Sequence, residues 1–328
     1  MTDPYIPTDD GYPDDAPAIV LVGPAGGGKT TFLQGLLRGH PNPATYGDWR
    51  VIPGRDAVYA DALLDNAEID AFPDATGSVA EETWTIIGTR PATQERSLWG
   101  LGAPKIRDGA EESFDLVICD IPGGSTVKVD DQANAETLEA VKQAAGIILL
   151  IDPTRMMKET QREVRQDGKE PISTYRHVFR LLKALDREVG PGRGQKLPQA
   201  LSVCISKLDH AEVFNLANNL DLLSAADRET PVVPAGEKSR DFFHHLCKMS
   251  VNSSDAGIPR ELEARFSRIT YHTVSSIGLY YDPDRGFDWD NVVNVKAQDG
   301  RETIVRYQPM EVWETLLDLY LVLQAGER

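Results

Sequence analysis

The chain has 328 residues, 41% of them hydrophobic, and its 34 basic against 51 acidic residues give a formal net charge of −17. This acidic balance argues against non-specific binding to nucleic acid or to an anionic membrane surface. No apolar run approaches the length of a membrane span and we expect no signal peptide, so the sequence predicts a soluble, cytoplasmic protein. Three cysteines without metal-like spacing, Cys119, Cys204 and Cys247, are expected to be reduced core residues.

Composition divides the chain into a short arm and one long domain. The first 17 residues are rich in Pro and Asp and have no periodic pattern, which is typical of a disordered acidic arm. The remainder, residues 18–328, is expected to form one domain. Its expected insertions lie near residues 40–75, 89–112, 210–266 and 279–309.

The most informative stretch is GPAGGGKT at residues 23–30, which follows an apolar run at 18–22 and precedes apolar residues at helical spacing. Strand, glycine loop and helix in this order predict a phosphate-binding P-loop. Lys29 is expected to reach the β- and γ-phosphates, and the Thr30 hydroxyl to bind Mg²⁺. The alternative is a glycine turn before an ordinary helix. The predicted phosphate-binding residues are Gly23, Ala25, Gly26, Gly27, Gly28, Lys29, Thr30 and Thr31.

Apolar periodicity predicts the next elements. Residues 55–71 have helical spacing, residues 72–78 form a loop, and residues 79–88 alternate as a strand. A polar insertion at 89–112 then leads into a buried strand at 114–119.

Asp120 ends that strand and opens a D-x-x-G sequence that closes at Gly123. In a P-loop fold, a carboxylate at this place holds Mg²⁺ directly or through water. The backbone N–H of Gly123 can approach the γ-phosphate, and the following loop can move when that phosphate leaves.

The second half continues the alternation of helices and apolar strands. Strands are expected at 146–151, 200–205 and near 268–274, with Asp152 directly after the first of them. Arg155 follows it and could reach a phosphate, although a surface position is the expected one. A hairpin is expected within 279–307, with its turn at Gln298-Asp299-Gly300. The expected helices are 131–145, 172–189, 213–226, 238–251, 258–266 and 310–323.

The sequence Ser206-Lys207-Leu208-Asp209 lies at the end of the 200–205 strand. In order and placement the motifs resemble the Ras-like, translation-factor-related class of P-loop GTPases, in which [NT]-K-x-D reads guanine. The resemblance implies that Asp209 accepts hydrogen bonds from guanine, and that Lys207 packs over the base with its amine near the P-loop. Ser206 departs from the usual Asn or Thr, so its tether to the P-loop would be shorter. The alternative makes Asp209 the N-cap of an ordinary helix.

The resemblance implies three further parts of the site. The loop Ser275-Ser276-Ile277 fits the place of the family's last base-binding loop. Thr76, with Thr83 as the alternative, fits the switch threonine that binds Mg²⁺ beside Thr30 and Asp120; Lys29 and Thr76 would then serve catalysis. Where many relatives have a water-orienting glutamine, this chain has Gly124, which predicts slow or partner-stimulated hydrolysis.

The expected fold is a three-layer α/β domain with a mostly parallel sheet and helices on both faces. The leading functional hypothesis is a switch that binds Mg²⁺ with GTP or GDP, hydrolyses GTP slowly and regulates an unidentified protein. A homodimer is a further hypothesis. The GPAGGGKT loop with its polar insertion, the DIPGG sequence and the C-terminal helix are similar to bacterial double-GTPases, which are thought to act in multi-gene conflict or signalling systems. The alternatives are a P-loop ATPase or kinase, and a nucleotide-holding module without turnover.

Overall fold

The structure is a computed structural model, and it describes only part of the chain. The described residues are 17–24, 26–53, 81–91, 93–95, 105–107, 111–119, 139, 141–157, 174–188, 196–224, 230–298 and 301–326. The expected arm at 1–17, apart from residue 17, lies outside these residues, as do the helix at 55–71, the loop at 72–78 and most of the helix at 131–145.

A seven-stranded sheet with the order β2-β3-β6-β1-β7-β8-β9 forms the centre of the molecule. The pairings from β6 through to β9 are parallel, whereas β2–β3 and β3–β6 are antiparallel. The strands are β1 (Ala18–Val22), β2 (Asp48–Pro53), β3 (Glu81–Thr89), β6 (Glu111–Cys119), β7 (Gly146–Ile151), β8 (Ala200–Ile205) and β9 (Ile269–Thr273). The sheet is therefore mostly parallel, as the sequence predicts.

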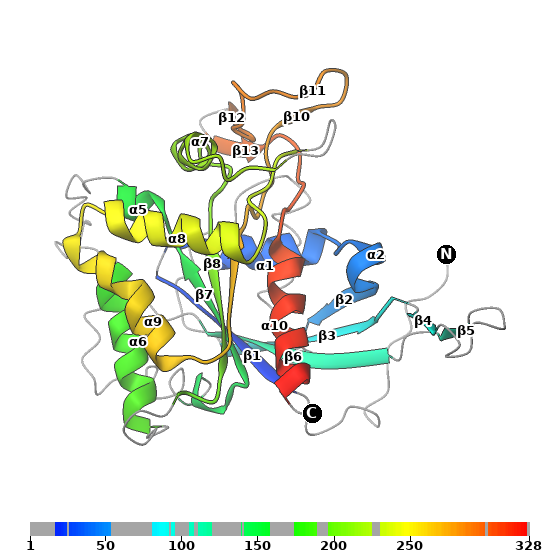
Figure 1. The fold of residues 1–328 in the computed structure, drawn as a ribbon. Helices are drawn as coiled ribbons and strands as arrows, with labels where there is room; N and C mark the ends of the chain where they lie inside the picture. The colour runs from blue at the N-terminus through cyan, green and yellow to red at the C-terminus, as the bar shows by residue number, and fades with distance from the viewer. Residues whose placement is uncertain are drawn as a thin grey trace.

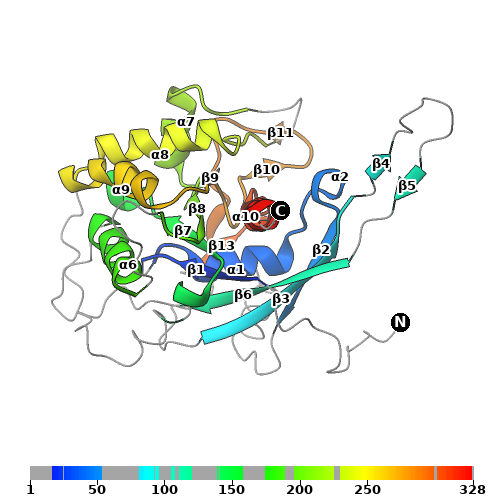
Figure 2. The same cartoon turned by 60° about the horizontal axis from the view of Figure 1, so that its bottom comes forward.

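Helices cover both faces of this sheet, so the expected three-layer α/β fold is confirmed (Figures 1 and 2). The helices are α1 (Lys29–Arg38), α2 (Pro43–Tyr46), α5 (Thr154–Met157), α6 (Thr174–Glu188), α7 (Ala211–Asn219), α8 (Glu237–Met249), α9 (Ile258–Arg265), α10 (Val312–Gly326) and the 3-10 turn η1 (Ser253–Gly257).

Alternation along the central strands divides the core into two halves. Val20, Ile147 and Val203 face the side that α6, α8 and α9 cover. Their neighbours Ile19 and Ile148 face the opposite side, where α1 and α10 pack. Successive residues of a strand point to opposite faces. Continuous apolar runs such as 146–151 are therefore the pattern that a sheet buried on both faces requires.

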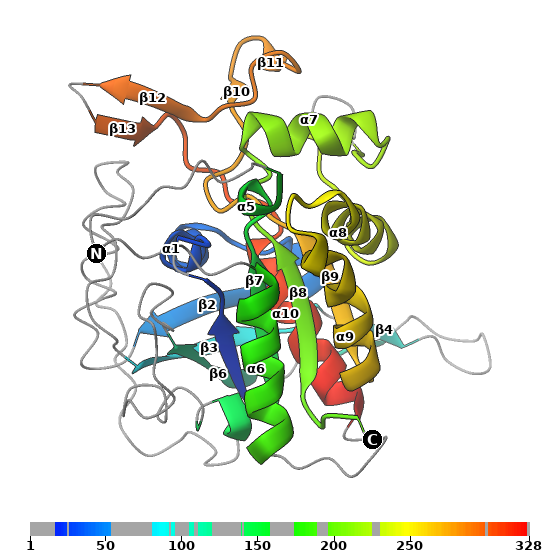
Figure 3. The same ribbon diagram turned by 90° about the vertical axis from the view of Figure 1, so that its left-hand side faces the viewer.

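Three small hairpins lie outside the sheet: β4 (Thr93–Glu95) with β5 (Lys105–Arg107), β10 (Tyr281–Asp282) with β11 (Gly286–Phe287), and β12 (Val295–Gln298) with β13 (Arg301–Ile304). Figures 1 and 3 show α7, β10–β11 and β12–β13 grouped beyond the end of the sheet at which α1 begins. The hairpin β4–β5 projects to the side, away from α6 (Figure 2).

Most predicted elements are confirmed, and the short elements α2, α5, η1 and β10–β11 are among those that were not expected. The antiparallel pairing of β12 with β13 confirms the hairpin, although its turn residues 299–300 lie outside the described residues. Strand β2 was not expected, nor was the hairpin β4–β5 within the polar insertion. Helix α7 ends at Asn219 rather than at residue 226, because Asp221 has the left-handed φ of 55° that a helix cannot continue.

Candidate functional site

The phosphate loop joins β1 to α1, as the sequence predicts. Gly26 and Gly28 have positive φ values of 69° and 90°, which glycine adopts without steric cost. The Gly27 N–H donates to the Pro24 carbonyl at 2.9 Å, and a Cβ at position 27 would lie only 2.8 Å from that oxygen. A Cβ at Gly28, in contrast, would meet nothing within 4 Å among the described residues. The loop thus has the backbone of a P-loop and open space beside its last glycine, whereas Ala25 lies outside the described residues.

Lys29 is the first residue of α1, and its side chain is only 7% exposed. The ammonium folds back across the loop and donates to the carbonyl oxygens of Gly23 at 2.8 Å and Pro24 at 3.3 Å. The loop therefore holds a buried cation at the N-terminus of a helix, where backbone N–H groups also favour an anion. Thr30 and Thr31 follow in the first turn of α1 and are partly exposed.

The structure describes the magnesium side of the site only in part. Thr30 lies in α1, whereas Thr76, Asp120 and Gly123 lie outside the described residues. Strand β6 ends at Cys119 and pairs in parallel with β1, so its carboxyl end lies at the same edge of the sheet as the phosphate loop. Thr83, the alternative switch threonine, lies inside β3 as expected. Among the described residues no group of three His, Cys, Asp or Glu side chains could hold a metal ion.

Ser206 connects the predicted base loop to the phosphate loop. Its hydroxyl lies 3.2 Å from the Gly27 carbonyl oxygen and 3.0 Å from the Ile151 carbonyl oxygen, within donating distance of both. A serine at this position is therefore long enough to reach the phosphate loop. Lys207 follows with a φ of 62°, which is rare for a residue with a side chain and marks a backbone held by its surroundings.

Asp209 and Ser275 lie together, although 66 residues separate them. The Ser275 hydroxyl donates to the Asp209 carboxylate and accepts the Gly278 N–H at 2.8 Å. The Leu208 N–H donates to the Val274 carbonyl at 3.0 Å, which fixes the two loops side by side. Ser276 and Ile277, the other predicted residues of the second loop, are 9% and 2% exposed.

The alternative role of Asp209 as a helix cap does not match this geometry. Helix α7 begins at Ala211, its N-cap residue is His210, and no side chain caps it. Burial raises the pKa of Asp209, whereas the hydrogen bond from Ser275 lowers it. The Asp209 carboxyl is therefore a desolvated acceptor with few donors, which favours a ligand that donates hydrogen bonds.

Asp152 belongs to this site although the sequence marks it only as a strand end. It follows β7, is 2% exposed and accepts the Thr154 N–H at 3.1 Å and the Thr154 hydroxyl at 2.7 Å. Its other carboxylate oxygen lies 2.7 Å from the Lys207 ammonium. The amine of Lys207 is thus held by Asp152. A carboxylate directly after a buried strand, one strand away from the phosphate loop, is the signal that could have identified it.

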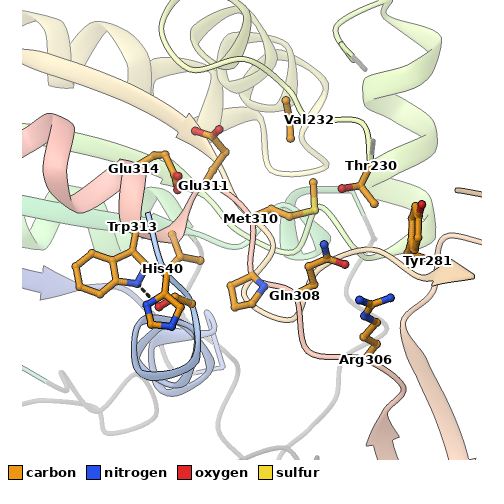
Figure 4. Close-up of a pocket in the computed structure, with 13 residues that line it drawn as sticks. His40, Thr230, Val232, Tyr281, Arg306, Gln308, Met310, Glu311, Trp313 and Glu314 are labelled. Atoms are coloured by element: carbon orange, nitrogen blue, oxygen red, sulfur yellow. Dashed lines mark hydrogen bonds between the residues drawn. The ribbon is translucent and has the colours of Figure 1, made fainter. Parts of the chain in front are cut away.

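A separate cavity of about 500 Å³ lies between the end of α1, the loop before α10 and the hairpin strand β10. Figure 4 shows the acidic side chains of Glu311 and Glu314 at one end of it and Arg306 beside Tyr281 at the other. None of the predicted site residues lines it. The candidate nucleotide site and this cavity are therefore distinct.

The sequence predicts reduced core cysteines and no membrane-spanning segment. Cys204 and Cys247 are buried and unpaired, and burial raises the pKa of both thiols. Across the described residues, every helix is too short or too polar to cross a bilayer.

Comparison with known proteins identifies the family resemblance. The sequence model of the family Double-GTPase 2 matches residues 90–239, which include β6, β7 and the segment from Ser206 to Asp209. A comparison with curated protein sequences found no match. The resemblance to P-loop GTPases of the Ras-like and translation-factor class, and to their double-GTPase type, is thus confirmed.

A comparison with solved structures found matches at low sequence identity and low TM-score. The chain is 15% identical to the signal recognition particle receptor SRb-GTP/SRX complex from Chaetomium thermophilum, covering 80% of this chain and 92% of that chain at a TM-score of 0.34. It is 13% identical to Era in complex with MgGDPNP and 16S ribosomal RNA (79% and 51% covered, TM-score 0.29). It is 14% identical to sup35 complexed with GDP (94% and 45% covered, TM-score 0.32). The chain thus spans about half the length of the Era and sup35 chains.

Proposed function

We propose that the chain, which resembles P-loop proteins of the GTPase type, is a guanine-nucleotide switch that binds Mg²⁺ with GTP and hydrolyses GTP slowly to GDP. The observation that carries this proposal is the partly buried carboxyl of Asp209, oriented by Ser275 and placed by β8 on the same edge of the sheet as the phosphate loop. The proposed output is regulation of a partner protein through loops that respond to the γ-phosphate.

The base preference follows from donor and acceptor chemistry. An ionised carboxyl is an acceptor only, and guanine presents two neighbouring donors, its ring N–H and its 2-amino group. Adenine has no such pair. A site that pairs its buried polar groups rejects an analogue that leaves them unpaired. Asp209 would therefore discriminate GTP from ATP, whereas Lys207 and Ser206 would support the loop around the base.

The phosphate end fits a magnesium nucleotide. Lys29 and the N–H groups of Gly26 to Thr31 would bind the phosphates, and Thr30, Thr76 and Asp120 would hold Mg²⁺. When bound, the ion neutralises charge on the β- and γ-phosphate oxygens. Lys29 already lies across the loop, where its ammonium contacts the Gly23 and Pro24 carbonyl oxygens, and a bound phosphate would offer it further acceptors.

The proposal of slow GTP hydrolysis rests on Gly124, the residue after Gly123. Hydrolysis needs a water molecule held in line with the scissile bond and a group that orients it. Gly124 has no side chain for this purpose. A partner protein or a second copy of the chain would supply the missing group. The nucleotide-holding module without turnover is the second candidate, and the same glycine favours it.

The test combines nucleotide competition with phosphate release from the purified chain. GTP and GDP should displace a fluorescent guanine nucleotide far better than ATP, and Lys29→Ala should abolish most binding. Hydrolysis should be no faster than about one per minute. A preference for ATP would contradict the guanine assignment. Fast turnover that does not depend on protein concentration would contradict the slow switch, and complete absence of turnover would favour the nucleotide-holding module.

A further inference from the structure

Arg155 lies against the phosphate loop. It follows β7 in the short helix α5, and a Cβ placed on Gly26 would lie 3.2 Å from its terminal Nη2 atom. This nitrogen is the only atom among the described residues that such a Cβ would meet within 4 Å. The side chain is 26% exposed. The guanidinium therefore lies beside the phosphate loop at Gly26, a residue whose N–H belongs to the expected phosphate cradle.

Asp152 forms an ion pair with this guanidinium. The Nε atom of Arg155 lies 3.5 Å from Asp152 Oδ2, the same oxygen that contacts the Lys207 ammonium at 2.7 Å. Asp152 thus sits between the two cations and holds the Nε side of the arginine. The terminal nitrogen Nη2 is directed to Gly26. A planar guanidinium held through one edge keeps its other donors in a fixed geometry.

Three cations of the described residues gather around Asp152 and the phosphate loop, although the whole chain carries −17. Arg155 and Lys207 share one carboxylate, and Lys29 adds a third cation in the adjacent loop. The nearby His177 of α6 is 7% exposed, and its Nε2 has no hydrogen-bond partner in the described part of the chain. Burial, followed by the charges of Lys29 and Arg155, lowers the pKa of His177 to about 4, so it stays neutral. Only the smaller part of this shift, which comes from Lys29 and Arg155, reflects the positive charge beside the phosphate loop.

We propose that Arg155 is a phosphate-binding residue that contacts the α- and β-phosphates of the bound nucleotide. The backbone N–H groups of a P-loop cradle these two phosphates, and Arg155 adjoins that backbone at Gly26. Arg binds phosphate oxygens through several parallel donors. Because GDP and GTP share the α- and β-phosphates, Arg155 strengthens the binding of both. The inference rests on the proposed nucleotide-binding function.

The experiment compares Arg155→Ala, Arg155→Lys and the wild type by calorimetric titration with GDP, a non-hydrolysable GTP analogue and guanosine. Arg155→Ala should weaken GDP and the GTP analogue by about tenfold each, and Arg155→Lys by less, since a lysine keeps the charge without the fork. Guanosine has no phosphate, so its affinity should not change. Arg180→Ala is the matched control, because Arg180 is an exposed arginine close enough to influence His177. Its loss should change affinities by no more than about twofold.

The outcomes separate this inference from the proposed function. If the wild type binds neither GDP nor the GTP analogue, the proposed function fails. If the wild type binds both and Arg155→Ala binds GDP as tightly, the inference alone is overturned. A loss confined to the GTP analogue, or an equal loss for guanosine, also overturns it. The melting temperature without nucleotide checks the fold. If Arg155→Ala does not fold, Arg155→Lys takes its place in the test. A ratio of GDP to guanosine affinity in Arg155→Lys equal to that of the wild type then overturns the inference.

Discussion

Replacing Asp209 by alanine tests the base assignment most directly. The carboxyl is held by the Ser275 hydroxyl and does not cap α7, so its removal should leave the fold intact. Guanine would lose two hydrogen bonds to a charged acceptor, and each such bond contributes about 1.5–3 kcal/mol. The sum of about 3 to 6 kcal/mol predicts a loss of GDP affinity of about a hundredfold or more. The affinity for ADP should not fall, because adenine makes no such pair.

The assay is titration calorimetry with GDP and ADP in the presence of Mg²⁺, and the readout is the ratio of the two affinities. Ser275→Ala is the matched control, because it removes the orienting hydroxyl but keeps the acceptor, and it should lower the ratio less. Asp209→Asn should change the base preference from guanine to xanthine. Its amide can donate to the 2-oxo group of xanthine, so xanthosine diphosphate should bind better than GDP. An unchanged GDP-to-ADP ratio in Asp209→Ala would refute the reasoning.

Three further substitutions test separate parts of the structure. Ser206→Ala removes the hydroxyl that faces two buried carbonyl oxygens, so it should lower the free energy of unfolding by about 1 kcal/mol and weaken GDP binding. Ser206→Thr keeps the hydroxyl and should retain both the stability and the GDP affinity. Equal losses in the two variants would contradict the role of this hydroxyl as a link to the phosphate loop. Gly88→Ala places a Cβ 2.3 Å from a ring atom of Trp49, so urea unfolding should show a loss of about 2 kcal/mol with GDP affinity unchanged; wild-type stability would contradict this packing. Burial, with a smaller effect of Glu311, raises the pKa of Glu314 from 4.5 to about 6. Because its pKa is raised, Glu314 stabilises the fold fully below about pH 4.5, and this stabilisation is lost as the pH rises through about 6. The free energy of unfolding of Glu314→Gln should therefore rise by up to about 2 kcal/mol relative to the wild type between pH 4.5 and pH 7. A difference in the free energy of unfolding between the two proteins that stays constant across this pH range would contradict the raised pKa of Glu314.

The middle of the central sheet could be predicted because β1, β7 and β8 are continuous apolar runs. Strands β7 and β8 have the predicted bounds, and Asp152 and Ser206 mark their ends. A strand buried on both faces leaves this pattern whatever its neighbours are. The helices that pack on the sheet were also found, since their apolar faces repeat at helical spacing.

Edge elements were not predictable in the same way. Strand β2 has the buried Trp49 between the exposed Asp48 and Arg50, and β3 pairs with it along its whole length. Propensity in so short a segment is overridden by the tertiary contacts that it makes. The end of α7 did carry a signal. Asn218 and Asn219 precede Asp221, and these short polar residues compete with helical hydrogen bonds.

The residues of the candidate site also fall into two groups, those that a sequence motif identifies and those that it does not. Lys29, Asp209 and Ser275 were named in advance because each stands in a short motif with chemistry of its own. Asp152 and Arg155 have no such motif, and their importance comes from the strand order. Strand β7 lies between β1 and β8, so the residues after it must lie between the phosphate loop and the base loop. An acidic residue there can hold a cation on each side, as Asp152 does. The sequence places both loops at one edge of the sheet, but only the order of the strands identifies the residues between them.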